Sequence, residues 1–173
     1  AQVTNPPIDS LREDTVMSLF TYLGRRGSLL EETPEHAHLI HLESPILSNE
    51  QLAALRALPD PAFKSVTLPA LMEAAKGPSE LRRAIASLCD AAAQAVDAGA
   101  AILVLSDRGV SRTHAPIPML LAVGAVHHHL IRQGRRMKVS IVVESAEPRD
   151  VHHFACLLGY GAAAINPYLG FET

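Results

Sequence analysis

The chain has 173 residues, of which 48% are hydrophobic and 19% charged, and its formal net charge at pH 7 is -3. This length suits a single domain with its own core, and no apolar run approaches the roughly 20 residues that span a bilayer. Basic residues occur in scattered pairs such as Arg25-Arg26 and Arg135-Arg136, and aromatic residues make up only 4% of the chain, so neither a membrane protein nor a nucleic-acid-binding surface is expected.

The first predicted element is a helix over residues 9–23. Asp9 is placed to cap its N-terminus, and Ser10 and Glu13 have the spacing of a capping box. Apolar residues recur at helical spacing, and Gly24 is placed to end the helix.

Strands and helices alternate along the rest of the chain. Strands are expected where apolar residues run without interruption, and helices where they recur every three or four positions. In chain order, the expected elements are a strand over 37–42, a helix over 49–57, a strand over 64–68, a helix over 79–96, a strand over 100–105, a helix over 116–133, a strand over 138–144, a helix that opens near Pro148 and ends at Gly159, and a strand over 162–166. This order predicts an α/β fold with a mostly parallel sheet and right-handed crossovers.

Polar residues stand at the ends of three of these strands. Ser106, Asp107 and Arg108 follow one buried strand, Glu144 ends the next, and Asn166 ends the last. The carboxyl ends of parallel strands lie at one edge of the sheet, where α/β proteins place ligand-contacting loops. We call these five residues the strand-end rim. One hypothesis is a stand-alone α/β enzyme that binds a small anionic ligand there; the alternative is that Asp107 and Arg108 only fix the loop.

Metal and nucleotide sites have little support in the sequence. Consecutive residues of a helix point about 100° apart, so the run His127–His129 does not converge on one ion as an i, i+4 pair does. A zinc module that uses this run and His152-His153 is a third hypothesis, but no zinc motif or glycine-rich phosphate loop accompanies them. We expect no metal and no cofactor in this chain.

The two cysteines, Cys89 and Cys156, lie among apolar residues with helical spacing. A free thiol in such a place behaves as a small buried hydrophobic side chain, and disulfides are rare in the cytosol. We therefore expect structural thiols in a cytoplasmic protein. The first residues show no secretory signal, and the lack of an initiating Met leads us to expect a segment of a longer chain.

Several long strings of residues resemble the central domain of glutamate synthase large chains. They begin with Gln-Val-Thr-Asn-Pro-Pro-Ile-Asp at 2–9 and Arg12-Glu13, and continue with segments 102–108, 116–132, 151–154 and 158–168. The resemblance covers nearly the whole chain. It implies that residues 1–173 form a single domain, the central-domain fragment of a larger multidomain chain.

The resemblance also implies a fold and a role. The family's large chain joins a glutaminase domain, this central domain, an FMN-binding barrel with an iron–sulfur cluster, and a β-helix. Ammonia released from L-glutamine is channelled to 2-oxoglutarate, and the product is reduced through the flavin, which yields two L-glutamate. The central domain resembles a trimmed (β/α) barrel without flavin, so the parent is expected to be the enzyme and the fragment to be noncatalytic.

The implied partners are the glutaminase and FMN-binding domains of the same parent chain and a small electron-transfer subunit. Carried over by position, Thr4 and Asn5 match the segment near the interdomain ammonia passage, and Asp9, Arg12 and Glu13 match the helix start behind it. These five residues have an alternative interpretation as helix caps and docking contacts. Four or five strands cannot close an eight-stranded barrel, so we expect an open, half-barrel-like sheet or self-association of the fragment.

Overall fold

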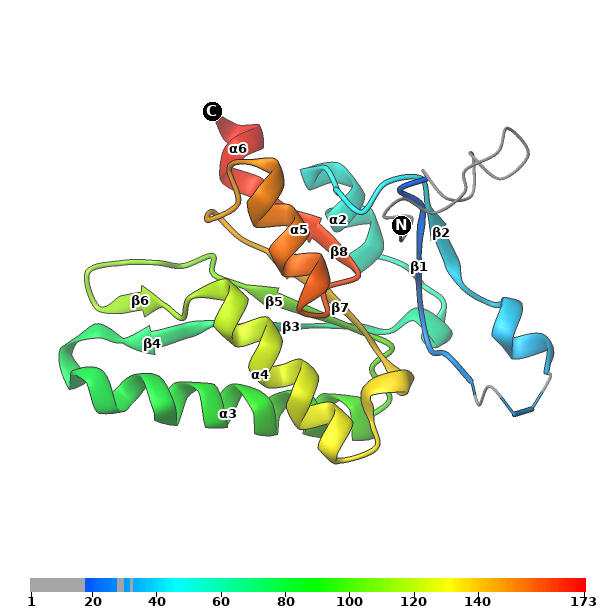
Figure 1. The fold of residues 1–173 in the computed structure, drawn as a ribbon, viewed down its shortest axis with the longest axis horizontal. Coiled ribbons are helices and arrows are strands. Elements are labelled where there is room, and N and C mark those ends of the chain that lie inside the picture. Colours follow the sequence, from blue (N-terminus) through cyan, green and yellow to red (C-terminus); the bar gives the residue numbers. More distant parts are fainter. Residues whose placement is uncertain (1–17, 28–29, 32) are drawn as a thin grey trace, which may run out of the picture.

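A parallel sheet of four strands forms the centre of the structure (Figure 1). The computed structural model describes residues 18–173 except 28–29 and 32. The strands lie in the order β3 (Ser65–Pro69), β5 (Ile102–Ser106), β7 (Ser140–Glu144) and β8 (Ala164–Asn166). Each pairs in parallel with the next, so the expected α/β fold with a mostly parallel sheet is confirmed.

A helix follows each of these strands along the chain. The helices of the structure are α2 (Asn49–Arg56), α3 (Pro78–Asp97), α4 (Met119–Arg132), α5 (Val151–Gly159) and α6 (Tyr168–Glu172). Short 3-10 turns lie at Pro34–Ala37, Pro61–Phe63, Ala74–Lys76 and Arg136–Lys138. Four consecutive strand–helix units make the arrangement compatible with a partial (β/α) barrel.

The sheet is covered on both faces, which explains why every residue of β5 and β7 is buried. Successive side chains of a strand point to opposite faces. Ile102 and Val104 therefore pack in one cluster with Leu52 of α2, while Leu103 and Leu105 pack in another with residues of α3, α4 and α5. The uninterrupted apolar runs in the sequence reflect these two cores.

The N-terminal prediction was wrong where the structure describes it. Residues 9–17 of the predicted helix lie outside the described residues, and its end forms the strand β1 (Thr21–Leu23), which pairs antiparallel with β2 (Ile40–Leu42). Thr21 and Tyr22 favour strand structure, and Leu23 is completely buried. Tertiary pairing thus overrides the helical spacing, and the strand expected over 37–42 does not join the main sheet.

Three short elements were not expected from the sequence. The strands β4 (Leu71–Glu73) and β6 (His114–Pro116) form a second antiparallel pair, and α6 ends the chain. The helix expected to open near Pro148 begins instead at Val151, because Asp150 caps its N-terminus. The Asp150 side chain accepts hydrogen bonds from the backbone N–H groups of His152 and His153. Within the described residues, none of the helices has the length and hydrophobicity needed to cross a bilayer.

Candidate functional site

The strand-end rim lies at the carboxyl edge of the parallel sheet. Register pairs Ser106 of β5 with Glu144 of β7, and Glu144 with Asn166 of β8. These three residues and Asp107 are all at most 4% exposed. The structure therefore brings the predicted polar residues to one buried edge, as parallel pairing requires.

Glu144 is the centre of this rim. Its carboxylate accepts hydrogen bonds from Ser106 Oγ at 2.6 Å and from Arg108 Nε at 2.8 Å. Arg56, in the last turn of α2, donates from both terminal nitrogens, at 2.7 and 3.3 Å. Burial alone would raise the pKa of Glu144, but the hydrogen bonds from Arg56, Ser106 and Arg108 hold it below its ordinary value. Glu144 is therefore ionised at neutral pH and is a poor base.

Arg108 has two neighbours besides Glu144 and Ser106, and both belong to α6. It donates to Glu172 Oε1 at 2.8 Å, and its Cζ lies 3.9 Å from the centre of the Tyr168 ring. Burial and the Asp107 carboxylate raise the pKa of Tyr168 to about 12. Asp107 itself accepts from Ser145 Oγ at 2.5 Å and from the Ala146 N–H. Arg108 thus holds α6, and Asp107 holds the loop after β7.

Asn166 serves a different connection. Its Nδ2 donates to Leu47 O and to Asn49 Oδ1, each at 2.9 Å, and so joins β8 to the start of α2. Its buried Oδ1 has no hydrogen-bond partner in the part of the chain that the structure describes.

Together with Arg56, the rim forms an ion-paired cluster in which the guanidinium groups of Arg56 and Arg108 already contact carboxylates. An incoming anion would have to displace Glu144 from Arg56 and Arg108, or Glu172 from Arg108. The two guanidinium groups that could meet a flavin phosphate here are thus already paired with carboxylates. Anion binding at the rim remains a prediction.

Two residues that contact the rim, Arg56 and Tyr168, were missed by sequence reasoning. Arg56 lies in the last turn of α2, eight positions after the Ser48 that begins its capping box. A basic residue there is ordinarily explained by its favourable interaction with the helix dipole, so it gave no signal of a site. Tyr168 follows Asn166 and Pro167, so its position after a strand end was a signal that could have included it.

The remaining candidates are the N-terminal residues, the two cysteines and the histidines. Thr4, Asn5, Asp9, Arg12 and Glu13 are outside the described residues. Cys89 is buried and Cys156 half-buried, both as free thiols. The described residues contain no group of three or more His, Cys, Asp or Glu side chains placed to hold a metal ion.

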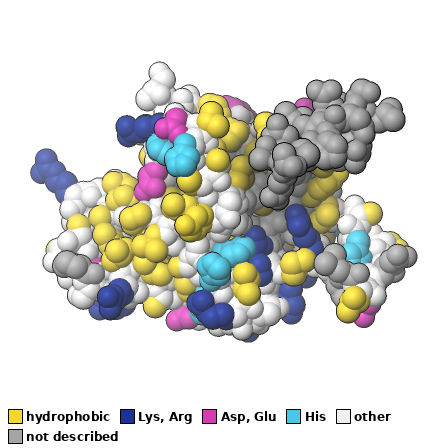
Figure 2. Space-filling model, viewed as in Figure 1, with side chains coloured by type: hydrophobic (Ala, Val, Ile, Leu, Met, Phe, Trp, Pro, Cys, Tyr) yellow, Lys and Arg dark blue, Asp and Glu magenta, His cyan; other side chains and the backbone are white. Residues whose placement is uncertain are grey.

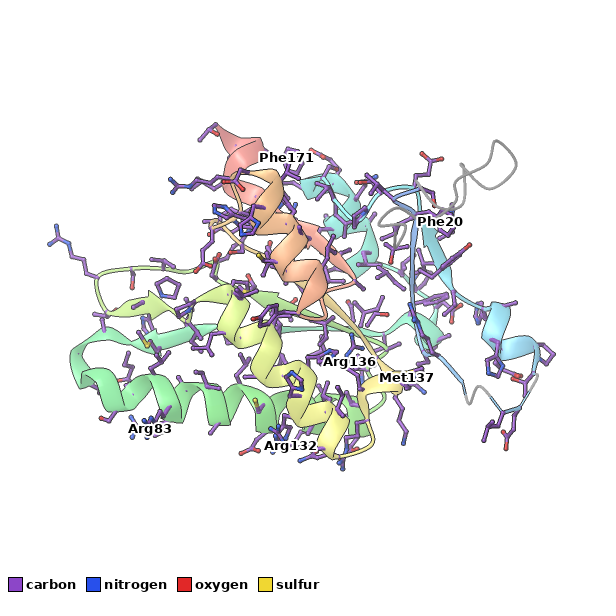
Figure 3. The ribbon with its side chains drawn as sticks, in the orientation of Figure 1. Phe20, Arg83, Arg132, Arg136, Met137 and Phe171 are labelled. Atoms are coloured by element: carbon purple, nitrogen blue, oxygen red, sulfur yellow. The ribbon has the colours of Figure 1, made fainter. Side chains whose placement is uncertain are left out.

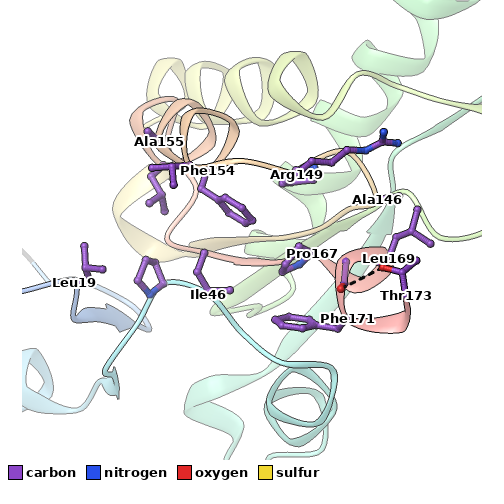
Figure 4. Close-up of a pocket in the computed structure, with 15 residues that line it drawn as sticks. Leu19, Ile46, Ala146, Arg149, Phe154, Ala155, Pro167, Leu169, Phe171 and Thr173 are labelled. Atoms are coloured by element: carbon purple, nitrogen blue, oxygen red, sulfur yellow. Dashed lines mark hydrogen bonds between the residues drawn. The ribbon is translucent and has the colours of Figure 1, made fainter.

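An apolar groove of about 940 Å³ runs between α5, α6 and the segment before α2 (Figure 4). It is lined mainly by aliphatic and aromatic side chains, including Leu19, Ile46, Phe154, Leu169 and Phe171. Val151 and Phe171 at this groove are 84% and 51% exposed. Exposed apolar surface of this kind is typical of a contact site.

The fold and the rim together define an α/β domain in which Arg56 and Arg108, at the strand ends, are paired with carboxylates of the same domain. The family model of the glutamate synthase central domain matches residues 1–173, and the chain belongs to this family. The resemblance noted in the sequence is thereby confirmed.

The relatives are much longer proteins. The chain is 48% identical over 173 residues to the glutamate synthase (NADPH) large chain of Bacillus subtilis and 51% identical over 176 residues to the chloroplastic ferredoxin-dependent glutamate synthase of Spinacia oleracea. It is 49% identical over 177 residues to ferredoxin-dependent glutamate synthase 2 of Synechocystis sp.. All of this chain is covered in each case, but it spans 11% of each relative's length.

Proposed function

We propose that residues 1–173 form the noncatalytic central domain of a glutamate synthase large chain, between a glutaminase domain and an FMN-binding domain of the same parent. It would contribute to the passage through which ammonia travels between their sites. The observation that carries this proposal is the match of the whole chain to 11% of much longer glutamate synthases. The parent would convert L-glutamine and 2-oxoglutarate to two L-glutamate, with FMN and the iron–sulfur cluster held in its other domains.

The rim supports a structural role for the domain. Glu144 holds Arg56 and Arg108, and Asp107 holds the loop after β7, so these charges fix the strand ends without a ligand. Family membership and this pairing together disfavour the stand-alone enzyme. Thr4, Asn5, Asp9, Arg12 and Glu13 remain the candidates for the passage, on the strength of the resemblance.

The apolar groove supports an interdomain position. Thr173 lines it beside Phe171, so in a parent with the implied domain order the following FMN-binding domain would emerge at this surface and cover it. A second apolar surface lies over α4, where Leu121 and Ile131 are 45% and 48% exposed (Figure 2). Burying such side chains stabilises a contact by about 25 cal/mol per Å² of apolar surface.

The test uses the full-length parent with Val151→Asp or Phe171→Asp in the groove. A carboxylate there would loosen the contact, so glutamine hydrolysis should continue while ammonia escapes to solvent instead of entering glutamate. The measurement is the ratio of glutamine consumed to glutamate formed from 2-oxoglutarate. Val110→Asp is the matched control, since Val110 is 52% exposed but lies outside the groove.

A raised ratio in the groove variants, with Val110→Asp unchanged, would support the interdomain role. An unchanged ratio in all three variants would count against it. The cytoplasmic setting and self-association of the fragment stay predictions, and the Spinacia oleracea relative is named as chloroplastic.

A further inference from the structure

A second cluster of cationic side chains lies at the opposite, amino-terminal edge of the sheet. A cavity of about 320 Å³ opens there beside the first residues of β7 and the segment before β8. Its polar lining includes Arg26, Arg136 and His127. Figure 3 places Arg136 where the chain passes from the end of α4 towards β7.

Arg136 is half-buried and contacts only neutral acceptors among the described residues. Its Nε donates to His127 Nδ1 at 3.0 Å, and its two terminal nitrogens donate to Val139 O at 2.7 Å and Gly161 O at 2.8 Å. A guanidinium has five N–H donors, so two remain. Two N–H groups are the number that a bidentate oxyanion uses.

His127 adds a further donor. Burial and the charge of Arg136 lower the pKa of His127, so its imidazole is neutral at pH 7. Because Nδ1 accepts the hydrogen bond from Arg136, the proton of the neutral ring is on Nε2. The ring therefore offers an N–H rather than a lone pair at its other nitrogen.

Arg26 brings a second positive charge to the same cavity. In the described part of the chain its side chain makes no hydrogen bond or ion pair, and its charge acts on Arg136. The adjacent basic pair provides a contrast, because Arg135 forms two hydrogen bonds with the Asp97 carboxylate, at 2.8 and 2.9 Å. Of the neighbouring Arg135 and Arg136, Arg135 thus has a counter-ion, and Arg136 has none among the described residues.

A partly buried guanidinium without a counter-ion costs free energy, and a second guanidinium beside it adds repulsion. At the other edge of the sheet, Glu144 supplies the missing charge to Arg56 and Arg108. We propose that the cavity lined by Arg26, His127 and Arg136 binds an oxyanion, either a free small anion or an acidic side chain presented by the rest of the parent chain. This inference does not depend on the proposed interdomain role.

The first test is an NMR titration of this chain with inorganic phosphate at constant ionic strength, followed through the ring signals of His127. We expect a saturable shift. Arg26→Gln should weaken binding about tenfold, as expected for the loss of one charged hydrogen bond. Arg135→Gln is the matched control and should leave the affinity unchanged, because Arg135 is already paired with Asp97 outside the cavity.

Arg136→Lys keeps the positive charge but loses the planar guanidinium with its paired N–H donors, so it should weaken phosphate binding while preserving the fold. Because Arg26 is exposed, Arg26→Gln remains decisive if the Arg136 variant fails to fold. A shift that does not saturate, or one that is equal in wild type and Arg26→Gln, would overturn the proposal.

Modification of Arg26 by phenylglyoxal, read by peptide mass spectrometry, distinguishes the two sources of the oxyanion. If phosphate protects Arg26 in both this chain and the full-length parent, the ligand is a free anion. If Arg26 is protected in the parent without phosphate but reacts in this chain, an acidic side chain of the parent occupies the cavity. Reaction in both proteins, unaffected by phosphate, would contradict an oxyanion site.

Discussion

Glu144 and Arg56 lie 88 residues apart in the sequence and form a bidentate ion pair, with nitrogen–oxygen distances of 2.7 and 3.3 Å. The pair joins the last turn of α2 to the carboxyl end of β7. The carboxylate side chain is 4% exposed and the arginine side chain 33% exposed. The buried carboxylate of Glu144 on the central strand β7 thus holds α2, which lies at the surface, against the sheet.

Glu144→Gln should destabilise the domain, because Arg56 and Arg108 lose their shared counter-ion. Breaking a buried pair costs about 3–5 kcal/mol, but water reaches both guanidinium groups, so we expect a loss of about 2 kcal/mol in the free energy of unfolding. Urea denaturation measures it. The control is Glu73→Gln, which removes an exposed ion pair with Lys76 and should have little effect on the free energy of unfolding. Equal effects of the two variants would contradict a stabilising role for the Glu144 ion pairs.

The contribution of Glu144 should depend on pH. Its pKa is lowered in the folded state from an ordinary value of 4.5, so its stabilising effect is present above pH 4.5 and is lost as the pH falls through the lowered pKa. The difference in unfolding free energy between wild type and Glu144→Gln should therefore shrink on acidification below pH 4.5. A difference that stays constant between pH 7 and pH 3 would mean that ionised Glu144 is not what stabilises the rim.

Gly161→Ala should destabilise the domain by about 2 kcal/mol or more. Gly161 has φ +116°, which alanine rarely adopts, and a Cβ there would clash with the His127 ring. Gly159→Ala is the control, because no described atom lies within 4 Å of its added Cβ and alanine favours the helical conformation. Thermal unfolding of the two variants measures the difference, and equal melting temperatures would contradict the close approach of Gly161 to His127.

The two thiols should react at very different rates. Cys89 is 6% exposed, and burial raises its pKa, so little reactive thiolate forms near neutral pH. Cys156 is half-buried, with Sγ 3.5 Å from His152 Nε2. Mass spectrometry after brief treatment with iodoacetamide should find the label on Cys156, and Cys156→Ser should remove it. Rapid labelling of Cys89 in the folded chain would contradict its burial.

The sequence predicted the central units because their signals are strong and local. The apolar runs that became β5 and β7 are long enough to identify buried strands, and the capping box at Ser48 located the start of α2. In contrast, β4 and β6 have three residues each, and their partners lie more than 40 positions apart. A pairing of that kind depends on tertiary structure and leaves little trace in local periodicity.

The rim could be predicted in part for the same reason. Parallel register brings strand ends together, which is why Ser106 and Glu144 were grouped correctly. Arg56 reaches the rim from a helix, and Arg136 reaches its cavity from a 3-10 turn. Where a long side chain ends depends on how those elements pack, and sequence spacing does not report that.

Within this domain, Glu144 takes the place that a ligand's carboxylate would take in a receptor. Glu144→Ala would therefore leave Arg56 and Arg108 facing a vacancy of about the size of acetate. We expect acetate, but not chloride at the same ionic strength, to restore the melting temperature of that variant by mass action. A protein scaffold of this type would become an anion receptor through the loss of one side chain, without any new cationic residue.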